Sequence, residues 1–249
     1  MVHSKFTPKI IYEDESLMVV DKPSGMVVNK AQTVKEETVQ EWFSNKILIP
    51  KSEILNKSKY PNSKSKNLEF RDSSLEFVEK GGVVHRLDKD TSGVMVLAKT
   101  PEAYEKLKLQ FLERKTVKKY IALVHGELKG EGVISTPIER HGQKFFVGND
   151  LSRTAITEWR ALQRVSPYTL MELTPHTGRT HQLRVHMRHI GHPIVSDPLY
   201  GDRKTWKKDL QICPRLFLHA KYLEFTHPVT GEKVHFESDL PTELENLVH

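Results

Sequence analysis

Four side chains able to do acid–base or electrostatic chemistry lie together in one short stretch: His85, Arg86, Asp88 and Asp90. An apolar run at residues 94–98 follows at once and indicates a buried strand. We therefore expect the four side chains to lie on a tight loop at the start of that strand, a common place for catalytic groups. From their types alone the two carboxylates are equally eligible as loop-stabilising groups, as a nucleophile with a helper, or as metal ligands.

One precedent for paired aspartates is the class of phosphatases that use an aspartyl nucleophile. Their pattern has an apolar strand running directly into the first aspartate, and a Thr or Val two residues after the second. In this chain His85 and Arg86 precede Asp88, and Ser92 stands two residues after Asp90. The pattern therefore argues against a phosphatase, and no other acidic cluster suggests a magnesium site.

The charge of the chain favours a polyanionic partner. Lys and Arg number 38 against 32 Asp and Glu, which gives a net charge of +6 at pH 7 for 249 residues. Such a surplus favours nucleic acid as the partner class. The chain has a single cysteine, Cys213, and neither an apolar leader nor an apolar run long enough to cross a bilayer. We therefore predict a cytoplasmic protein that is not held at a membrane.

Five histidines lie close together in the second half of the chain: His176, His181, His186, His189 and His192. Imidazole is a common ligand of zinc and iron, so a metal centre is one interpretation. The chain lacks a His-Glu-x-x-His motif, a Gly-x-Ser-x-Gly elbow and a Gly-rich phosphate loop, and it has only one thiol. We predict that no metal is bound and that these histidines lie on a helix surface or contact RNA. A metal-dependent hydrolase is the alternative.

Apolar runs and their spacing predict the elements that must position these side chains. Strands are expected at residues 10–12, 17–20, 26–28, 94–98, 118–124, 170–173, 222–225 and 234–236. Helices are expected at Val39 to Phe43, after an N-cap at Thr100, and from Leu183 to a stop at Gly191. The Lys- and Ser-rich stretch at residues 45–66 is expected to be a solvated loop or, alternatively, an arm that orders on RNA phosphates.

The last of these helices carries charged residues on one face. Leu183 and Met187 belong to its apolar stripe, whereas His181, Arg184 and Arg188 lie on a different face. We expect these three side chains to point together away from the core. A solvated surface is the usual role of such a face, so this pattern alone does not assign a function.

Several short motifs occur along the chain, and both their residues and their order are informative. They are His85-Arg86-Leu87-Asp88 with Thr91-Ser92-Gly93, Lys119-Tyr120-Ile121-Ala122, Thr177-Gly178-Arg179-Thr180-His181-Gln182-Leu183-Arg184-Val185-His186, Gly191-His192-Pro193-Ile194, residues 197–201 and Leu218-His219-Ala220. In this order they resemble the RluA family of RNA pseudouridine synthases, and the resemblance covers residues 10–236. The opening hairpin with Asp21-Lys22-Pro23-Ser24-Gly25 also resembles the first hairpin of that family.

The resemblance implies a site and a reaction. Asp88 matches the family's catalytic aspartate, which attacks the ribose or initiates cleavage of the glycosidic bond, so that uracil can rotate and reattach through C5. Tyr120 matches the tyrosine that stacks on the uracil and assists removal of the C5 proton, and Arg184 matches the basic residue that pairs with the aspartate. Arg86 matches the arginine that helps to extrude the target base and takes its place. Further substrate contacts are expected from His85, Arg179, His181 and Leu183.

These implied roles agree with the physics of base flipping. A base held in a stack is out of reach, and extruding it costs a few kcal/mol, which stacking on an aromatic ring and a filler in the gap can offset. The surplus Lys and Arg residues would hold backbone phosphates, so RNA binding should weaken as salt rises.

We therefore expect a single α+β catalytic domain over residues 1–249, with its core at about residues 10–236 and no separate N-terminal RNA-binding domain. Its central sheet should be long, mixed and mostly antiparallel, flanked by helices and loops. The expected function is isomerisation of specific uridines to pseudouridine in a structured ribosomal or transfer RNA, with no cofactor and no obligate protein partner. A non-catalytic RNA-binding or assembly factor that uses the same basic cleft is the alternative.

Overall fold

The computed structural model describes residues 6–47 and 67–248. Of the Lys- and Ser-rich stretch at residues 45–66, the first three residues end a helix, and the rest lie outside the described residues.

Ten strands lie in the described part of the chain. In chain order they are β1 (Lys9–Glu13), β2 (Leu17–Lys22), β3 (Ser92–Ala98), β4 (Val117–His125), β5 (Glu131–His141), β6 (Lys144–Val147), β7 (Thr154–Val165), β8 (Tyr168–Pro175), β9 (Leu218–Thr226) and β10 (Lys233–Glu237). Every strand predicted from the sequence is present except the one at residues 26–28.

Six α-helices and one 3-10 helix lie in the same part of the chain. They are α1 (Val39–Ile47), α3 (Asn67–Lys80), α4 (Pro101–Leu112), η1 (Leu151–Arg153), α5 (Gln182–His189), α6 (Arg203–Ile212) and α7 (Thr242–Glu245). The three predicted helices are confirmed as α1, α4 and α5. Within the described residues, no helix has the length and apolar character needed to cross a bilayer.

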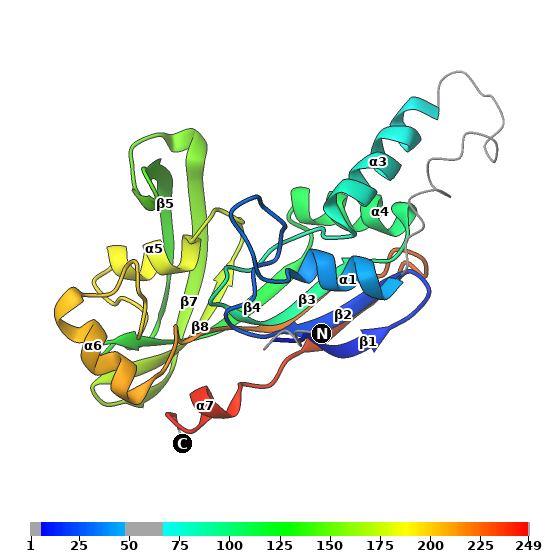
Figure 1. Ribbon diagram of the computed structural model, residues 1–249. Coiled ribbons are helices and arrows are strands. Elements are labelled where there is room, and N and C mark those ends of the chain that lie inside the picture. The colour runs from blue at the N-terminus through cyan, green and yellow to red at the C-terminus, as the bar shows by residue number, and fades with distance from the viewer. Residues whose placement is uncertain (1–5, 48–66, 249) are drawn as a thin grey trace. The chain divides into compact units, whose positions relative to one another are not determined.

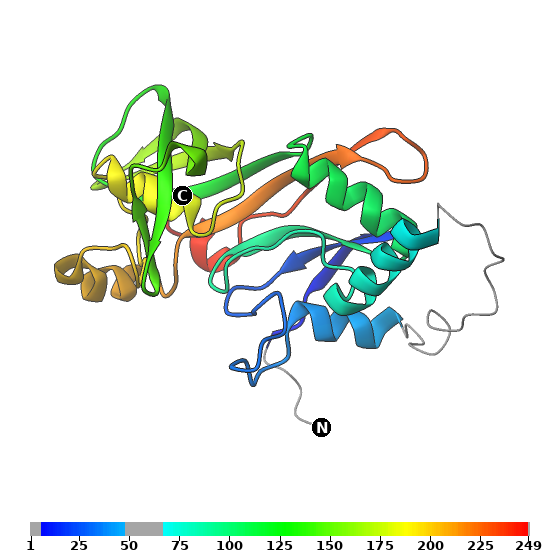
Figure 2. The same ribbon diagram turned by 90° about the horizontal axis from the view of Figure 1, so that it is seen from above.

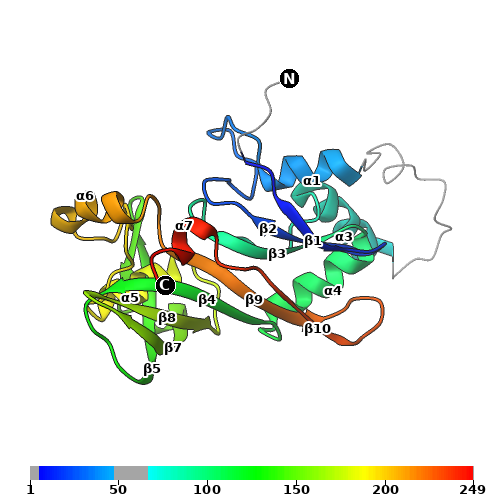
Figure 3. The same ribbon diagram turned by 90° about the horizontal axis from the view of Figure 1, so that it is seen from below.

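The strands pair into a mixed sheet. Antiparallel pairs join β1 to β2, β4 to β8 and β9, β5 to β6 and β7, and β7 to β8, whereas β3 pairs with β9 in parallel. Figure 3 shows β4, β8, β7 and β5 as neighbouring strands. This mostly antiparallel sheet with helices packed on it confirms the predicted α+β class.

Contacts between Cα atoms divide the chain into two compact units. The first unit comprises Met1–Lys89, Met95–Thr116 and Phe225–Val234. The second unit comprises Asp90–Val94, Val117–Glu224 and His235–His249. The first unit therefore holds β1, β2 and the later part of β3, and the second unit holds β4 to β8 and most of β9.

In the first unit, α1, α3 and α4 lie on one face of β1 and β2 (Figures 1 and 2). The predicted N-cap of α4 is confirmed, because Thr100 Oγ1 accepts a hydrogen bond from Ala103 N–H at 3.2 Å. Tyr104 of α4 is buried and packs edge-on against Phe77 of α3, with ring centroids 5.9 Å apart. These contacts fix the helix layer that supports the first unit.

The strand predicted at residues 26–28 is wrong. The main-chain carbonyls of Val27 and Val28 instead accept hydrogen bonds from Val39 and Gln40 N–H, both at 3.0 Å. The first N–H groups of a helix have no partner within it, so this segment satisfies the start of α1 rather than another strand. The run is apolar although it is no strand, because Met26 and Val28 are buried.

The β1–β2 hairpin turns around one carboxylate, Asp14. Asp14 Oδ1 accepts hydrogen bonds from Ser16 N–H at 2.7 Å and Leu17 N–H at 2.9 Å, and its Oδ2 lies 2.8 Å from His227 Nε2. Partial burial opposes ionisation, but the hydrogen bonds from Ser16, Leu17 and His227 outweigh it and hold the pKa of Asp14 well below its ordinary value. The ionised carboxylate therefore stabilises the folded hairpin.

We expect Asp14→Asn to lower the free energy of unfolding by about 1–3 kcal/mol at pH 7. Because the pKa of Asp14 is lower in the folded than in the unfolded state, its contribution is present above the unfolded pKa, about 4, and is lost as the pH falls below it. Urea denaturation at pH 7 and at about pH 3 measures this, and the difference between wild type and variant should shrink at the lower pH. Glu15→Gln in the same turn is the matched control, since Glu15 is exposed. An equal loss in both variants would contradict the assignment.

In the second unit, α5 packs against β5, β6, β7 and β8 (Figure 1). The main core cluster is apolar and includes Leu123 of β4, Met171 of β8 and Met187 of α5. At the sheet, Gly93 of β3 pairs with Ala220 of β9, and a Cβ at position 93 would lie 2.2 Å from the Ala220 carbonyl oxygen. Only glycine permits this parallel pairing, which explains why the Thr-Ser-Gly motif ends as it does.

Candidate active site

The loop at residues 85–91 is anchored on β3 within the first unit through His85. Val96 N–H donates a hydrogen bond to His85 Nε2 at 3.1 Å, and the imidazole stacks on Phe111 of α4 with ring centroids 4.4 Å apart. Since Nε2 accepts, the neutral ring carries its proton on Nδ1, as inferred from this hydrogen bond. His85 was predicted to bind substrate, and the structure gives it contacts that position the loop.

The rest of the loop alternates between anchored and accessible residues. Leu87 is buried, Asp88 is half-buried, and Arg86 and Lys89 are exposed. The predicted nucleophile and the predicted gap filler are therefore on accessible positions beside an apolar anchor.

A buried ammonium group clamps the end of this loop. Lys22 is fully buried at the end of β2, and its Nζ donates to the carbonyls of Pro23 and Met26 at 2.8 Å and of Lys89 at 3.1 Å. Gly25 N–H donates to the same Lys89 carbonyl at 2.8 Å. Burying a charge is costly unless its donors are satisfied, so these hydrogen bonds tie the end of the loop at Lys89 to the segment that follows β2. Sequence reasoning missed Lys22, although it belongs to the Asp-Lys-Pro-Ser-Gly motif.

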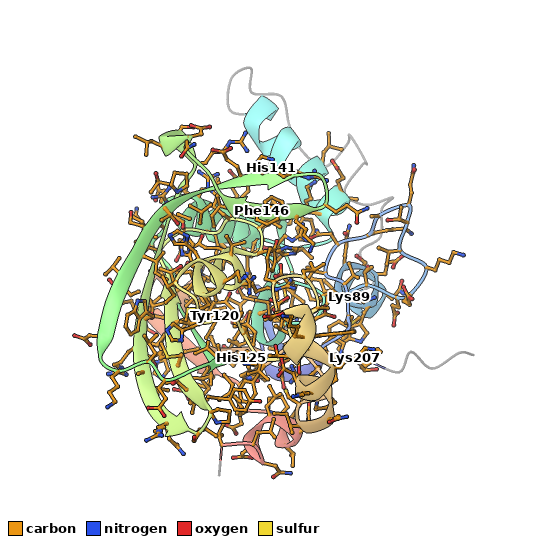
Figure 4. All side chains as sticks on the ribbon, turned by 90° about the vertical axis from the view of Figure 1, so that its left-hand side faces the viewer. Lys89, Tyr120, His125, His141, Phe146 and Lys207 are labelled. Atoms are coloured by element: carbon orange, nitrogen blue, oxygen red, sulfur yellow. The ribbon has the colours of Figure 1, made fainter. Side chains whose placement is uncertain are left out.

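Tyr120 lies on β4 at a register shift. Lys119 pairs with Tyr222 of β9, whereas Tyr120 pairs with Ala220, so the extra residue, Lys221, forms a bulge in β9 opposite this point of β4. Such a bulge interrupts the pairing of the two strands locally. Because Ala220 also pairs with Gly93, Tyr120 lies two strands from Gly93, about 10 Å at the usual spacing. Figure 4 labels Tyr120 and shows it on β4, where it is half-buried.

Arg184 on α5 is buried, with 2% of its surface exposed, and does not lie on a solvated face. Its Nε and Nη2 donate to the two carboxylate oxygens of Asp197 at 2.8 and 2.7 Å. Leu199 and Tyr200 N–H donate to Asp197 Oδ1 as well, at 2.9 and 3.0 Å. The expectation that Arg184 points away from the core is therefore wrong, because a bidentate pair with further hydrogen bonds satisfies both buried charges.

Tyr200 extends this network. The guanidinium Cζ of Arg184 lies 5.1 Å from the Tyr200 ring centroid, a cation–π contact. The Tyr200 hydroxyl accepts from Phe145 N–H at 3.0 Å and lies 2.8 Å from His181 Nδ1. Neither Asp197 nor Tyr200 was assigned a role from the sequence, although both lie in the motif at residues 197–201. The network holds the Arg184 guanidinium in one orientation.

The turn before α5 is fixed by Gln182 and Thr177. Gln182 Oε1 accepts from Thr177 Oγ1 at 2.6 Å and from Arg179 N–H at 3.1 Å, and its Nε2 donates to the Ile156 carbonyl at 2.9 Å. Two residues of the family-like motif are therefore structural. Of the predicted contact residues there, Arg179 is exposed, whereas Leu183 is buried in the core cluster.

The clustered histidines have separate partners. His176 pairs with Glu158, His181 with Tyr200, His186 with Thr157, and His192 with the His125 carbonyl. Burial lowers the pKa of His186 to about 4, so its ring is neutral at physiological pH. Within the residues that the structure describes, no group of three or more His, Cys, Asp or Glu side chains is arranged to hold a metal ion.

The predicted site residues divide between the two units. His85, Arg86 and Asp88 belong to the first unit, and Tyr120, Arg179, His181, Leu183 and Arg184 belong to the second. Within the second unit, one network brings His181 and Arg184 together through Tyr200.

Known proteins similar to this chain share one description. The pattern of the family "RNA pseudouridylate synthase" matches residues 16–189. The chain is 39% identical over 247 residues to "Ribosomal large subunit pseudouridine synthase D" of Pseudomonas aeruginosa, covering 95% of this chain and 69% of that protein. It is 38% identical over 250 residues to the protein of the same description from Xanthomonas campestris pv. campestris, covering 96% and 68%.

Two solved human structures have a similar fold. "Human RNA Pseudouridylate Synthase Domain Containing 4" is 25% identical with a TM-score of 0.66, covering 97% of this chain and 92% of that chain. "Human RNA Pseudouridylate Synthase Domain Containing 1" is 24% identical with a TM-score of 0.68, and the match covers 97% of this chain and 87% of that chain. This second similarity is evidence for the fold only.

Proposed function

Since this chain belongs to the family of RNA pseudouridylate synthases, we propose that it isomerises a uridine in the RNA of the large ribosomal subunit, with Asp88 initiating the reaction. Pseudouridine synthase activity on RNA follows from the family and its relatives. The sequence alone leaves the choice between ribosomal and transfer RNA open. We choose ribosomal RNA because of the names of the two bacterial relatives. The cytoplasmic location and the absence of an obligate protein partner remain predictions.

In the proposed reaction one bond breaks and one forms on the same nucleotide. Either Asp88 attacks C1′ of the ribose and displaces the uracil, or it initiates cleavage of the N1–C1′ bond without bonding to the sugar. The uracil then rotates and C5 bonds to C1′, which releases the Asp88 carboxylate where it had bonded to the ribose. The C5 proton leaves and N1 gains a proton, so atoms and electrons balance within the nucleotide. Substrate and product are isomers, and the predicted absence of a cofactor is consistent with this balance.

The observation that carries the role of Asp88 is the rigid loop on which it lies. The Lys22 clamp fixes the Lys89 carbonyl, and His85 fixes the other end of the loop on β3. Asp88 itself stays half-exposed between these anchors. A carboxylate held in place but accessible has the preorganisation that a nucleophile needs.

Arg86 and Arg184 take different parts in the proposal. Arg86 is exposed on the loop and would fill the gap left by the extruded base, which lowers the cost of flipping. Arg184 is buried and fixed by Asp197, so its guanidinium has a defined place in the site. It would pair with the catalytic carboxylate as the family resemblance implies.

Tyr120 is expected to contribute in two separable ways. Tyr120→Phe keeps the ring that stacks on uracil but removes the hydroxyl that assists loss of the C5 proton, so conversion should slow by about 10²- to 10⁴-fold with RNA affinity unchanged. Tyr120→Ala should also weaken RNA binding, since stacking contributes about 1–3 kcal/mol per base. Single-turnover conversion and a binding titration with the same RNA separate the two effects. Wild-type conversion by Tyr120→Phe would refute the role of the hydroxyl.

The substrate proposal is tested with purified protein and two RNA classes. Transcripts of large-subunit ribosomal RNA and bulk transfer RNA, both free of modification, are incubated with the wild-type chain and their pseudouridines mapped. We expect a defined uridine to be converted in the ribosomal RNA only. Conversion confined to transfer RNA would overturn the substrate class, and conversion of neither at high enzyme concentration would overturn the proposed function.

A further inference from the structure

Helix α6, in the second unit, presents a basic face. Its ten residues include Arg203, Lys204, Lys207 and Lys208 against a single acid, Asp209. The three lysine side chains are exposed. None of them forms an ion pair with any residue that the structure describes, so their charges face solvent.

Three other bases of the second unit lie beside acids. Arg160 and Lys119 both lie within ion-pair distance of Glu172, and Arg164 pairs with Glu127. Lys204, Lys207 and Lys208 have no such acidic partner among the described residues, and all three lie on one face of a single helix.

The one acid of α6, Asp209, points away from the face that carries the lysines. Asp209 is 2% exposed, and its Oδ2 lies 2.9 Å from Nε2 of His125 at the end of β4. Figure 4 labels His125 and Lys207 and shows α6 next to that end of β4. At 3.6 residues per turn, Lys204, Lys207 and Lys208 fall within an arc of about 100° on the side away from Asp209. The inward turn of Asp209 thus leaves an outward face of one sign.

The position of α6 is also fixed relative to Arg184 in the same unit. Asp202 caps the helix by accepting from Lys204 N–H at 2.9 Å, and it follows directly on the segment that holds Asp197. At the other end, Cys213 N–H donates to the Asp209 carbonyl at 2.7 Å, and Ser196 Oγ donates to the Cys213 carbonyl at 2.6 Å. The C-terminal end of α6 is therefore held by a hydrogen bond from Ser196, and its N-terminal end follows five residues after Asp197.

We propose that the face formed by Lys204, Lys207 and Lys208 binds backbone phosphates of the RNA substrate and thereby aligns the RNA with the site, an inference that rests on the proposed function. The lysines span about 6 Å along the helix, so they can serve neighbouring phosphates of one strand. Lysine binds phosphate as a point charge and carries no base preference, so this face contributes affinity and position and leaves sequence choice to other residues.

A triple variant tests this proposal: Lys204→Gln, Lys207→Gln and Lys208→Gln. Glutamine preserves helix propensity and removes only the charges. The control removes the same net charge from exposed lysines elsewhere, through Lys9→Gln, Lys35→Gln and Lys129→Gln. Dissociation constants for a large-subunit ribosomal RNA fragment are measured for both variants between 50 and 200 mM salt, together with single-turnover conversion at saturating enzyme.

We expect the α6 variant to bind about 10- to 100-fold more weakly than the control, with the slope of log Kd against log salt reduced by about 2. Its conversion rate at saturation should stay near that of wild type. Binding and salt slope equal to those of the control would overturn the proposal and leave another acidic partner, such as a protein, for this face. Binding is read independently of turnover, so a wild-type chain that binds but does not convert the RNA would refute the proposed function while leaving this inference testable.

Discussion

Asp88→Asn is expected to abolish conversion of uridine to pseudouridine, by about four orders of magnitude or more, while fold and RNA affinity are retained. The amide has nearly the shape of the carboxylate but cannot act as a nucleophile. Loss of function should arise in the chemical step, because the contacts by which Lys22 and His85 hold the loop are left in place by the substitution. Single-turnover conversion, thermal unfolding and an RNA titration on the same preparation measure the three quantities.

Asp90→Asn is the matched control for that experiment. Asp90 lies two residues away on the same loop and was equally eligible from residue types alone. We assign it a loop-stabilising role, so its amide variant should convert RNA at a rate within about tenfold of wild type and lose stability instead. Loss of conversion in Asp90→Asn with wild-type conversion in Asp88→Asn would reverse the assignment.

Asp197→Asn is expected to lower the free energy of unfolding by about 3–5 kcal/mol, since it removes the charge of the buried carboxylate to which the Arg184 guanidinium donates two hydrogen bonds. For a chain of this length that corresponds to a melting temperature lower by roughly 10 °C. The rate of uridine conversion should also fall, even at a temperature where the variant is folded, because the Arg184 guanidinium loses its fixed orientation. Thermal unfolding and single-turnover conversion at low temperature measure the two effects.

Two further variants sharpen this test. Glu127→Gln removes the partner of Arg164 in an exposed pair and should cost less than about 1 kcal/mol. The double variant Arg184→Met, Asp197→Leu replaces the buried pair by apolar groups and should recover much of the lost stability. It should still fail to convert RNA, because the guanidinium is absent. Wild-type conversion in the stable double variant would show that Arg184 has no part in the reaction.

Elements whose burial follows a short-range pattern could be predicted from the sequence. The apolar run of β3 is buried throughout, and Thr100 caps α4 as expected. The strand predicted at residues 26–28 is wrong because an apolar run does not reveal whether its carbonyls will meet another strand or the start of a helix. A local sequence pattern therefore predicts that a segment is buried more reliably than it predicts which groups the segment's main chain hydrogen-bonds.

The buried charges of the site could not be predicted in the same way. Lys22 donates to the carbonyl of Lys89, 67 positions away, and Arg184 is paired with Asp197. A polar face of a helix predicts exposure, and only a partner supplied by the tertiary structure makes burial of its charge tolerable. The motifs of the family resemblance did contain Lys22, Arg184 and Asp197, but residue types alone gave no reason to place them inside.

The central claim is that this chain catalyses pseudouridine formation through Asp88, and complementation followed by pseudouridine mapping tests it most directly. Cells lacking the gene receive either the wild-type chain or Asp88→Asn at equal abundance, and the pseudouridines of their total RNA are mapped. A modification in large-subunit ribosomal RNA should be absent without the gene, return with wild type and stay absent with Asp88→Asn. Its return with Asp88→Asn would contradict the claim and favour a non-catalytic RNA-binding or assembly factor.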